Sequence, residues 1–312
     1  MYCKGQLVQL QADLPLIQKA GLGLAAVSYD SIAVLRDFAA RRHITFPLLS
    51  DHDSKVIRAW NMVNREYPRG AQLNLANERI ELYAMGDVPV YGVAYPGVFI
   101  IGPDRTVEWR LASDAAEFRI TGACILARTA GVMQERSPLT AAGARVAIAT
   151  TSSNTRAGLG TRLSIGLELT IPAGLHIYGP DVEGGYKGLA WNMDASRCWE
   201  VGPPVYPAPK MMHFEATGET LPIYEGTLRL RREFVVEPFL KPNDPSIYEI
   251  FCSRCLDRHR RLTPSGMLRF QTCSDRVCFP PRDIPVSWNF DFLEPDLERV
   301  PEDLRREFEI DG

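Results

Sequence analysis

Cysteine is the residue type with the clearest chemical potential in this chain, and its distribution is uneven. Four of the seven cysteines crowd into a short C-terminal stretch: Cys252, Cys255, Cys273 and Cys278. Such a cluster exceeds what core packing usually requires, so it indicates disulfides, a redox-active pair or a metal site. The other three stand alone in the sequence: Cys3, Cys124 and Cys198.

The segment around Cys273 and Cys278 is the most specific in the chain. An expected strand leads into Cys273, a short polar loop follows, and Pro280 and Pro281 come directly after Cys278 and Phe279. A loop of this length can bring two thiols within disulfide range. Such a pair is either exchange-active or a static clamp.

A zinc site is the competing interpretation of the same cysteines. Cys252 and Cys255 have the Cys-x-x-Cys spacing, and Cys273 and Cys278 follow after a gap that nearly reproduces a four-thiolate zinc pattern. The second pair is separated by four residues, where zinc ribbons usually have two. Alternatively, Cys252 and Cys255 form their own redox couple in a loop insertion.

The isolated candidates carry less information. Cys3 lies at the front edge of an expected helix, where backbone N–H groups and the helix dipole stabilise a thiolate. Cys124 lies on an apolar helix and is expected to be a small buried core residue, and Cys198 is expected to be a half-buried thiol without a partner. Surface or hydrogen-bonded roles, without catalysis, are expected for all histidines: His43, His52, His176, His213 and His259.

Composition excludes several classes of function. The chain has 312 residues, a formal charge of -3, 46% hydrophobic and 23% charged residues. Without a basic field, nucleic-acid or anionic-membrane binding is not expected. No apolar run reaches the roughly 18 residues that a membrane span needs, and the first residues lack a secretory signal pattern.

Hydrophobic periodicity divides the chain into two domains. Residues 1–133 alternate helices and strands, which predicts an α/β layer with a mostly parallel sheet. Residues 134–144 are expected to be a linker, and residues 145–293 hold short alternating runs separated by Pro and Gly turns, which predicts an all-β sandwich. Residues 294–312 are acidic and are expected to form a solvated tail or short surface helix, to which we assign no chemistry.

The first domain resembles the thioredoxin-like redoxins of the AhpC/TSA peroxiredoxin superfamily. The residues that carry the resemblance are Tyr2-Cys3-Lys4, Gln6-Leu7, Ala25 to Asp30, Phe46 to Asp51 and Tyr95 to Ile101. The resemblance implies that Pro96 is a cis-proline. In that family a first cysteine attacks peroxide or a disulfide and a second one resolves the intermediate.

In this pattern the attacking cysteine and the first central strand would precede Met1, so Cys3 matches the resolving position only. The expected fold is therefore an incomplete thioredoxin-like domain, and we do not expect peroxidase activity from this chain. The expectation is that the sequence starts late in a longer gene, whose upstream part would restore the site and a signal peptide.

The second domain closely resembles the amino-terminal domain of the thiol:disulfide interchange protein DsbD, an immunoglobulin-like sandwich. Further matches are Pro172 to Tyr178 and Leu221 to Tyr224. The resemblance implies that Cys273 and Cys278 are the redox pair and that residues 210–220 form a loop that caps them, with Phe214 as the aromatic lid. It also implies an extracytoplasmic, periplasmic location.

The sequence thus predicts a thiol:disulfide oxidoreductase, or redoxin-type antioxidant protein, that acts by thiol–disulfide exchange without a bound cofactor. Its expected partner is a thioredoxin-like or disulfide-bearing protein, with peroxide as a substrate in the full-length family. The alternative is a non-catalytic extracytoplasmic interaction module with structural disulfides or zinc bound by Cys252, Cys255, Cys273 and Cys278.

Overall fold

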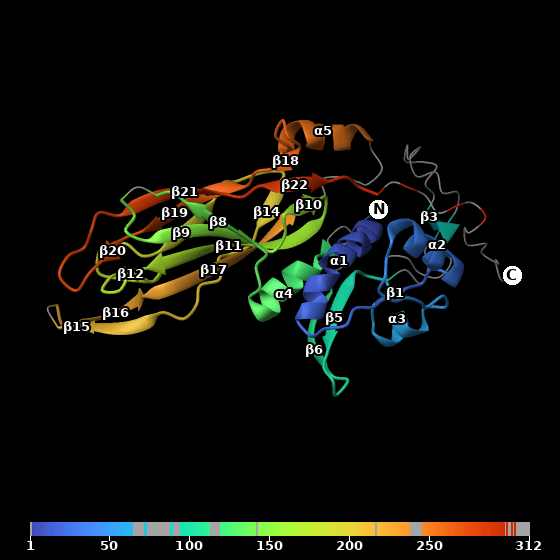
Figure 1. The fold of residues 1–312 in the computed structure, drawn as a ribbon, viewed down its shortest axis with the longest axis horizontal. Coiled ribbons are helices and arrows are strands. Elements are labelled where there is room, and N and C mark those ends of the chain that lie inside the picture. Colours follow the sequence, from blue (N-terminus) through green and yellow to red (C-terminus); the bar gives the residue numbers. More distant parts are fainter. Residues whose placement is uncertain are drawn as a thin grey trace.

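The computed structural model joins an α/β region to a strand-rich region, and together they give an elongated molecule (Figure 1). It describes residues 2–64, 72–73, 88–89, 94–112, 119–141, 143–215, 217–237, 245–296, 298, 301 and 303. Within that part of the chain, every helix is too short or too polar to cross a membrane.

The first region alternates helices and strands, as the periodicity predicts. Its elements are α1 (Tyr2–Lys19), β1 (Ala26–Ser28), α2 (Ile32–Arg42), β2 (Leu48–Ser50), α3 (Lys55–Ala59), β3 (Gln72–Leu73), β4 (Val88–Pro89), β5 (Gly97–Ile101), β6 (Val107–Ala112), β7 (Arg119–Ile120) and α4 (Gly122–Ala130). Local chemistry fixes the helix ends. The Ser31 hydroxyl caps α2 by accepting a hydrogen bond from Val34 N, and His43 ends α2 in the left-handed conformation.

The strands of this region form separate pairs instead of the expected single sheet. β1 and β2 pair in parallel, β3 and β4 pair antiparallel, and β5 and β6 form an antiparallel hairpin. No described strand joins the β1–β2 pair to the β5–β6 pair. The small core between α1, α2 and α4 contains Leu10, Leu14, Ile17, Phe38, Ile44, Phe46 and Leu126.

The second region is the predicted β-sandwich. Its elements are β8 (Glu135–Leu139), β9 (Ala147–Ser152), β10 (Arg156–Gly158), β11 (Thr161–Ile171), β12 (His176–Tyr178), β13 (Ala190–Met193), β14 (Trp199–Val201), β15 (Lys210–Phe214), β16 (Glu219–Tyr224), β17 (Gly226–Val236), α5 (Pro245–Cys255), β18 (Arg261–Leu262), β19 (Ser265–Phe270), β20 (Thr272–Cys273), β21 (Arg282–Ser287) and β22 (Phe290–Leu293).

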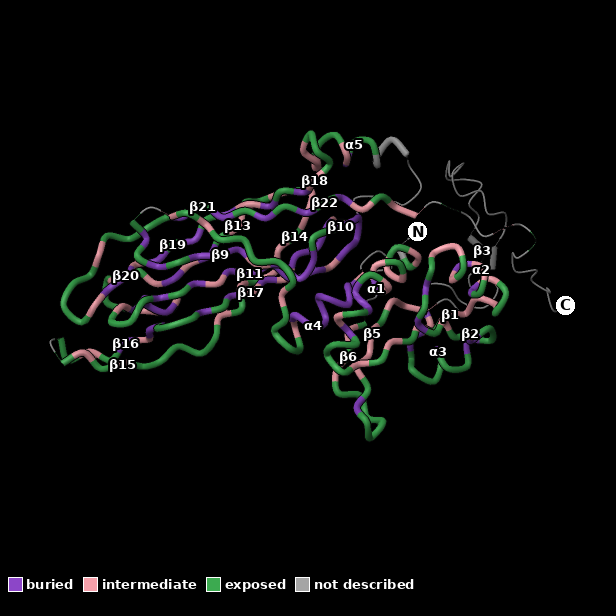
Figure 2. The backbone as a smooth tube through the Cα atoms, in the orientation of Figure 1, coloured by how far each residue is buried: buried purple, intermediate pink, exposed green. Residues whose placement is uncertain are grey.

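The strands of the sandwich are divided among four sheets. The largest has the strand order β14-β17-β11-β9-β8, and a second has the order β13-β19-β21. Alternate residues of β17 and β19 are buried, as expected for strands with one face on a core. Figure 2 shows the buried backbone running through the middle of the sandwich. Its largest buried side chains include Trp191, Phe234, Phe270 and Phe290.

Two smaller sheets lie at opposite ends of the sandwich. β15-β16-β12-β20 lies at the end far from α1, and β10-β22-β18 lies at the end where α5 and the α/β region are found (Figure 1). The first of these sheets carries Cys273, and α5 carries Cys252 and Cys255. The C-terminal cysteines are therefore distributed between the two ends of the sandwich.

The boundary between the regions differs from the predicted linker. Residues 135–139 are not linker but strand β8, which pairs with β9 at the edge of the largest sheet. β7 pairs in parallel with the start of β11, and Ile120, Cys124 and Ile125 are buried in the core of the sandwich. Segment 119–130, predicted to belong to the first domain, thus contributes to the core of the second.

The described part of the acidic tail lies against the first region. Asp296 pairs with Arg42 at 2.9 Å and with Lys4 at 3.7 Å, and Glu298 pairs with Arg41 at 2.5 Å and with Arg42. These acidic side chains complement the basic last turn of α2 and one basic residue of α1. Ion pairs thus attach these two residues of the expected solvated tail to the first region, while Glu298 stays exposed.

Candidate functional site

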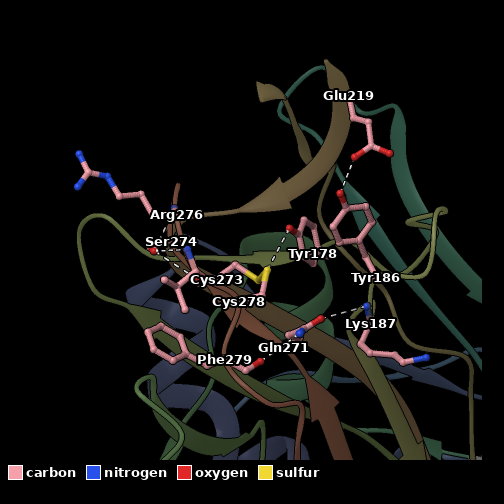
Figure 3. Close-up of a disulfide and its surroundings, with 11 residues drawn as sticks. Tyr178, Tyr186, Lys187, Glu219, Gln271, Cys273, Ser274, Arg276, Cys278 and Phe279 are labelled. Carbon is pink, nitrogen blue, oxygen red and sulfur yellow. Dashed lines mark hydrogen bonds between the residues drawn. A yellow bond between two sulfur atoms is a disulfide. The ribbon is translucent and has the colours of Figure 1, made fainter. Parts of the chain in front are cut away.

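Cys273 and Cys278 form a disulfide at the far end of the sandwich (Figure 3). Cys273 is the last residue of β20 and pairs across the strand with His176 of β12 on one side and with Cys278 on the other. Phe279 N donates to Thr272 O at 2.9 Å, which continues the antiparallel pairing just outside the disulfide. The prediction that this segment brings the two thiols together is confirmed in geometry.

The loop between the two cysteines is closed by its own polar side chain. Ser274 N donates to Val277 O at 2.8 Å, and Ser274 Oγ accepts from the backbone N–H groups of Arg276 and Val277. A serine that bonds to the backbone two and three residues ahead stabilises a tight turn. Gln271 supports the base of the loop, because its Nε2 donates to Phe279 O at 3.0 Å.

The two sulfurs lie in different environments. The Cys273 residue is 0% exposed, whereas Cys278 lies on the exposed side of the loop. Thiol–disulfide exchange requires a thiolate to approach one sulfur of the disulfide, so access decides which sulfur is attacked. The geometry therefore leaves Cys278 as the accessible sulfur and Cys273 as the protected one.

Aromatic side chains surround the disulfide. Residues directly opposite each other in an antiparallel pair share a face, so His176 lies on the face of Cys273, and Tyr178, two residues further along β12, lies there as well. Tyr178 packs with Cys273 in a small cluster separate from the main core. The centroids of the Tyr178 and Tyr186 rings are 4.7 Å apart.

Tyr178 contacts the accessible sulfur directly. Its hydroxyl lies 3.6 Å from Cys278 Sγ and points toward it in Figure 3. A sulfur in a disulfide has no proton, so the hydroxyl is the donor. Burial raises the pKa of Tyr178, which keeps this donor protonated. The neighbouring Tyr186 hydroxyl donates to Glu219, and this bond raises the pKa of Tyr186.

His176 differs from its expected role as a surface or hydrogen-bonded histidine. The residue is 2% exposed, and its Nε2 has no hydrogen-bond partner among the residues that the structure describes. Burial lowers the pKa of His176, because the charged imidazolium is poorly solvated there. A neutral histidine therefore packs beside the buried sulfur. The centroid of its ring lies 5.2 Å from the centroid of the Phe214 ring.

Residues 210–220 form a hairpin rather than a loop. β15 and β16 pair from Lys210↔Ile223 to Phe214↔Glu219. Phe214 ends β15 and packs against the cluster that contains Cys273 and Tyr178. The position agrees with an aromatic residue close to the disulfide, while the role of Phe214 as a lid stays a prediction.

Cys3 lies far from this disulfide. It lies in the first turn of α1, as predicted, and is exposed, and Arg119 Nη2 donates to its Sγ at 2.9 Å. Figure 1 places α1 and β20 in different parts of the molecule, with the length of the sandwich between them. The three cysteines predicted to carry catalysis, Cys3, Cys273 and Cys278, are therefore not brought together.

The prediction of a cis-proline at Pro96 is wrong. No peptide bond in the described ranges is cis, so Tyr95–Pro96 is trans. The trans form of an X–Pro bond is favoured by about 0.5–1 kcal/mol unless its surroundings select the other isomer. Here Tyr95 N donates to Met62 O at 2.7 Å, which fixes the chain just before the proline.

The remaining cysteines also correct the sequence predictions. Cys198 is not a thiol without a partner but forms a disulfide with Cys255. Because Cys255 is bonded to Cys198, it does not form the alternative redox couple with Cys252. Both residues lie on helix α5 and not in a loop. Cys124 is buried as predicted, and burial raises the pKa of its thiol to about 11.

The predicted four-thiolate zinc set does not assemble. Its members are divided between two disulfides and one free thiol at different ends of the sandwich. Zinc is bound by thiolates that converge on one point, and a sulfur in a disulfide is not a thiolate. Across the described residues, no group of three or more His, Cys, Asp or Glu side chains is arranged to hold a metal ion.

Comparison with known families finds a match for each of the two regions. Residues 1–110 match the AhpC/TSA family, and residues 149–286 match the family described as thiol:disulfide interchange protein DsbD, N-terminal. The first region is thus similar to the AhpC/TSA family, and the second is similar to the N-terminal domain of DsbD. Both predicted resemblances are confirmed, and together they support a thiol–disulfide redox role in general.

Individual similar proteins cover only parts of the chain. Peroxiredoxin Bcp of Xanthomonas campestris pv. campestris is 32% identical over 71 residues, which are 23% of this chain and 44% of that protein. The chain thus spans less than half of the length of this curated relative. The crystal structure of the N-terminal periplasmic domain of ScsB from Proteus mirabilis has 18% identity, a TM-score of 0.31 and 49% coverage of each chain.

Sequence reasoning missed features of the disulfide's surroundings. It did not place His176 or Tyr178 beside Cys273, although both lie in the Pro172 to Tyr178 match and alternate as residues of one strand face. It also gave no difference between Cys273 and Cys278. The end of β20 at Cys273 is the signal that could have separated them, because the residue in the strand is buried and the residue after the loop is exposed.

Proposed function

We propose that the DsbD-type domain passes electrons by thiol–disulfide exchange at Cys273 and Cys278, with a thioredoxin-like or other disulfide-bearing protein as its partner. The observation that carries this proposal is the contrast between the exposed Cys278 and the fully buried Cys273 within one disulfide. A structural clamp gains nothing from an exposed sulfur, whereas exchange requires one.

In the reductive direction, a partner thiolate attacks Cys278 Sγ. A new bond forms between the partner sulfur and Cys278, the bond between Cys278 and Cys273 breaks, and Cys273 leaves as a thiolate that takes up a proton. A second partner thiolate then attacks the partner sulfur of the mixed disulfide and releases Cys278 as a thiolate. The partner thiols become a disulfide and the chain gains two electrons.

The surrounding side chains favour this order of events. The Tyr178 hydroxyl donates to Cys278 Sγ and stabilises negative charge that develops on this sulfur when it is the leaving group of the mixed disulfide. Cys273 stays beneath the aromatic side chains and is out of reach of the partner. It is therefore the resolving cysteine when electrons flow in the opposite direction.

The same proposal includes the setting in which the chain works. Two disulfides in one domain are typical of an oxidising compartment, which supports an extracytoplasmic location. The chemistry needs no bound cofactor. An antioxidant role for Cys3 is supported by its exposure and its contact with Arg119, with Cys3 resolving an intermediate that another thiol begins.

Trapping with matched serine variants tests the exchange. The probe is a thioredoxin whose single remaining active-site thiol is activated as a mixed disulfide with an aromatic thiol. The Cys273→Ser chain keeps the accessible thiol and is expected to form a covalent adduct at Cys278. The Cys278→Ser chain keeps only the buried thiol and is expected to form at least about 100-fold less adduct at Cys273, because access limits the attack.

Mapping the adducts makes the result specific. Trypsin cleaves after Arg276, so Cys273 and Cys278 fall on different peptides, and adducts at Cys3 or Cys252 are separated from both. Equal trapping in the two variants would contradict the assigned order of the two cysteines. No adduct at either position, with the domain folded, would overturn exchange and favour the structural clamp.

A further inference from the structure

A second disulfide lies at the opposite end of the sandwich. Cys255 is the last residue of α5, and Cys198 directly precedes β14. Their Cα atoms are 5.6 Å apart, and both residues pack against the main core. Figure 1 shows α5 above β18 and β22, at the end of the sandwich far from β20. Neither the AhpC/TSA chemistry nor the proposed exchange at Cys278 uses this disulfide.

A free thiol lies one helical turn before this disulfide. Cys252 precedes Cys255 by three residues on α5, is partly buried and packs against the same core. Residues three apart on an α-helix lie on one face, with their Cβ atoms about 5–6 Å apart. Cys252 and Cys255 thus approach the sandwich from one side of α5, and on that side Cys255 is bonded to Cys198.

A cation lies against the free thiol. Arg260 Nη2 is 3.7 Å from Cys252 Sγ, and the same guanidinium pairs with Glu294. The guanidinium thus places a charged group in direct contact with this sulfur. The contact comes from the turn after α5, so the helix and the turn together hold a nucleophile, a neighbouring charge and a disulfide in one place.

We propose that Cys198, Cys252 and Cys255 form a second thiol–disulfide exchange site, whose substrate is the chain's own disulfide. Cys252 loses its proton, and its thiolate attacks Cys198 Sγ. The Cys198–Cys252 bond forms, the Cys198–Cys255 bond breaks, and Cys255 leaves as a thiolate that takes up a proton. One disulfide and one thiol are present before and after, so the step needs no external oxidant or reductant.

The exchange moves the covalent attachment of α5 by one turn. A rise of about 1.5 Å per residue makes this shift roughly 4.5 Å along the helix. The free thiol alternates between Cys252 and Cys255, and Cys198 stays bonded in both isomers. This site works without Cys273 and Cys278, so its test is independent of the proposed function.

Alkylation of the oxidised, full-length chain tests the proposal. The protein is held at mildly alkaline pH without reductant and quenched with acid, and its free thiols are then blocked with a maleimide. Trypsin cleaves after Arg197 and Arg254, so Cys198, Cys252 and Cys255 lie on three different peptides. We expect the maleimide on both Cys252 and Cys255, with Cys198 linked to the unlabelled one.

Two serine variants complete the test. Cys252→Ser removes the nucleophile and is expected to lose all label at Cys255, with the Cys198–Cys255 bond intact. Cys255→Ser is expected to form a Cys198–Cys252 disulfide. If the wild-type chain carries the label on Cys252 alone at all times, the proposal is wrong, whether or not Cys255→Ser folds. Free Cys198 and Cys252 in a folded Cys255→Ser chain would overturn it as well.

Discussion

The two disulfides of the sandwich differ in both the chain they enclose and the access they give to a partner. Cys273–Cys278 joins residues five positions apart and leaves one sulfur exposed, whereas Cys198–Cys255 joins residues 57 positions apart and fixes the end of a helix to the sandwich. The length of the closed loop makes their contributions to stability differ. The exposure of their sulfurs makes their reactivity toward a partner differ.

The entropy of the unfolded chain gives the size of the difference in stabilisation between the two disulfides. A cross-link restricts the unfolded chain more when it closes a longer loop, which gives about 4 kcal/mol for the separation of 57 and about 2 kcal/mol for the separation of five. A disulfide that must open and close during function is suited to the smaller contribution. The comparison assigns exchange with a partner protein to the end that carries Cys273 and Cys278, and the larger stabilisation to the end that carries Cys198 and Cys255.

The largest effect is expected for Cys198→Ser. This change removes the sulfur common to both isomers of the α5 site, so the long loop opens and the free energy of unfolding falls by about 4 kcal/mol. Denaturant unfolding without reductant measures it. The matched control is Cys255→Ser, which is expected to lose much less stability because Cys252 replaces the missing sulfur. Equal losses in both variants would contradict this replacement.

A smaller loss of stability is expected when Cys273 and Cys278 are both changed to serine. The enclosed loop is short, so the free energy of unfolding should fall by about 2 kcal/mol, while exchange with the activated thioredoxin at this end is lost completely. Unfolding curves and adduct mapping on the same sample measure the two effects. A loss as large as that of Cys198→Ser would remove the contrast between the two disulfides.

Tyr178→Phe sharpens the comparison by changing the chemistry without opening a loop. Removing the hydroxyl that donates to Cys278 Sγ costs one hydrogen bond of about 1 kcal/mol, so release of Cys278 from the mixed disulfide should slow roughly fivefold. Stopped-flow kinetics measure the rate. Tyr186→Phe is the control, because the Tyr186 hydroxyl bonds to Glu219 instead of to sulfur. An unchanged rate in Tyr178→Phe would remove Tyr178 from the mechanism.

The smallest expected effect concerns pH and His176. The unfolded chain protonates this histidine near its ordinary pKa of 6.5, whereas burial lowers the pKa in the folded state. The unfolded state therefore binds the proton first, so the stability of the domain falls as the pH drops below about 6.5 and is unaffected above it. Nearby Asp275 and Glu225 oppose the shift. His176→Gln should flatten the dependence of the unfolding midpoint between neutral and acidic pH relative to wild type.

Much of this architecture could be predicted from local sequence. The alternating helices and strands predicted for residues 1–133 and the short strands predicted for residues 145–293 are both found. Cys273 and Cys278 were found because a short polar loop between a strand and two prolines is a local signal. In each case, the information lies within a few residues of the element it specifies.

The features that sequence reasoning missed depend on distant contacts. Nothing near Cys198 indicates Cys255, because their pairing is created by the packing of α5 on the sandwich. β8 contains Ser137 and Pro138 and reads as linker, yet it pairs along its length with β9. An edge strand needs one neighbour only, so its own composition can be poor for a strand.

Helix α4 has a consequence for how the molecule unfolds. Its Cys124 and Ile125 are buried in the core of the sandwich, its Leu126 belongs to the core of the α/β region, and Asp13 of α1 accepts a hydrogen bond from Ala123 N. Neither region can open fully without exposing one face of this helix. Hydrogen exchange should therefore report α4 as part of one cooperative unit that includes β11, and a stable isolated sandwich should begin at Arg119 and not at residue 145.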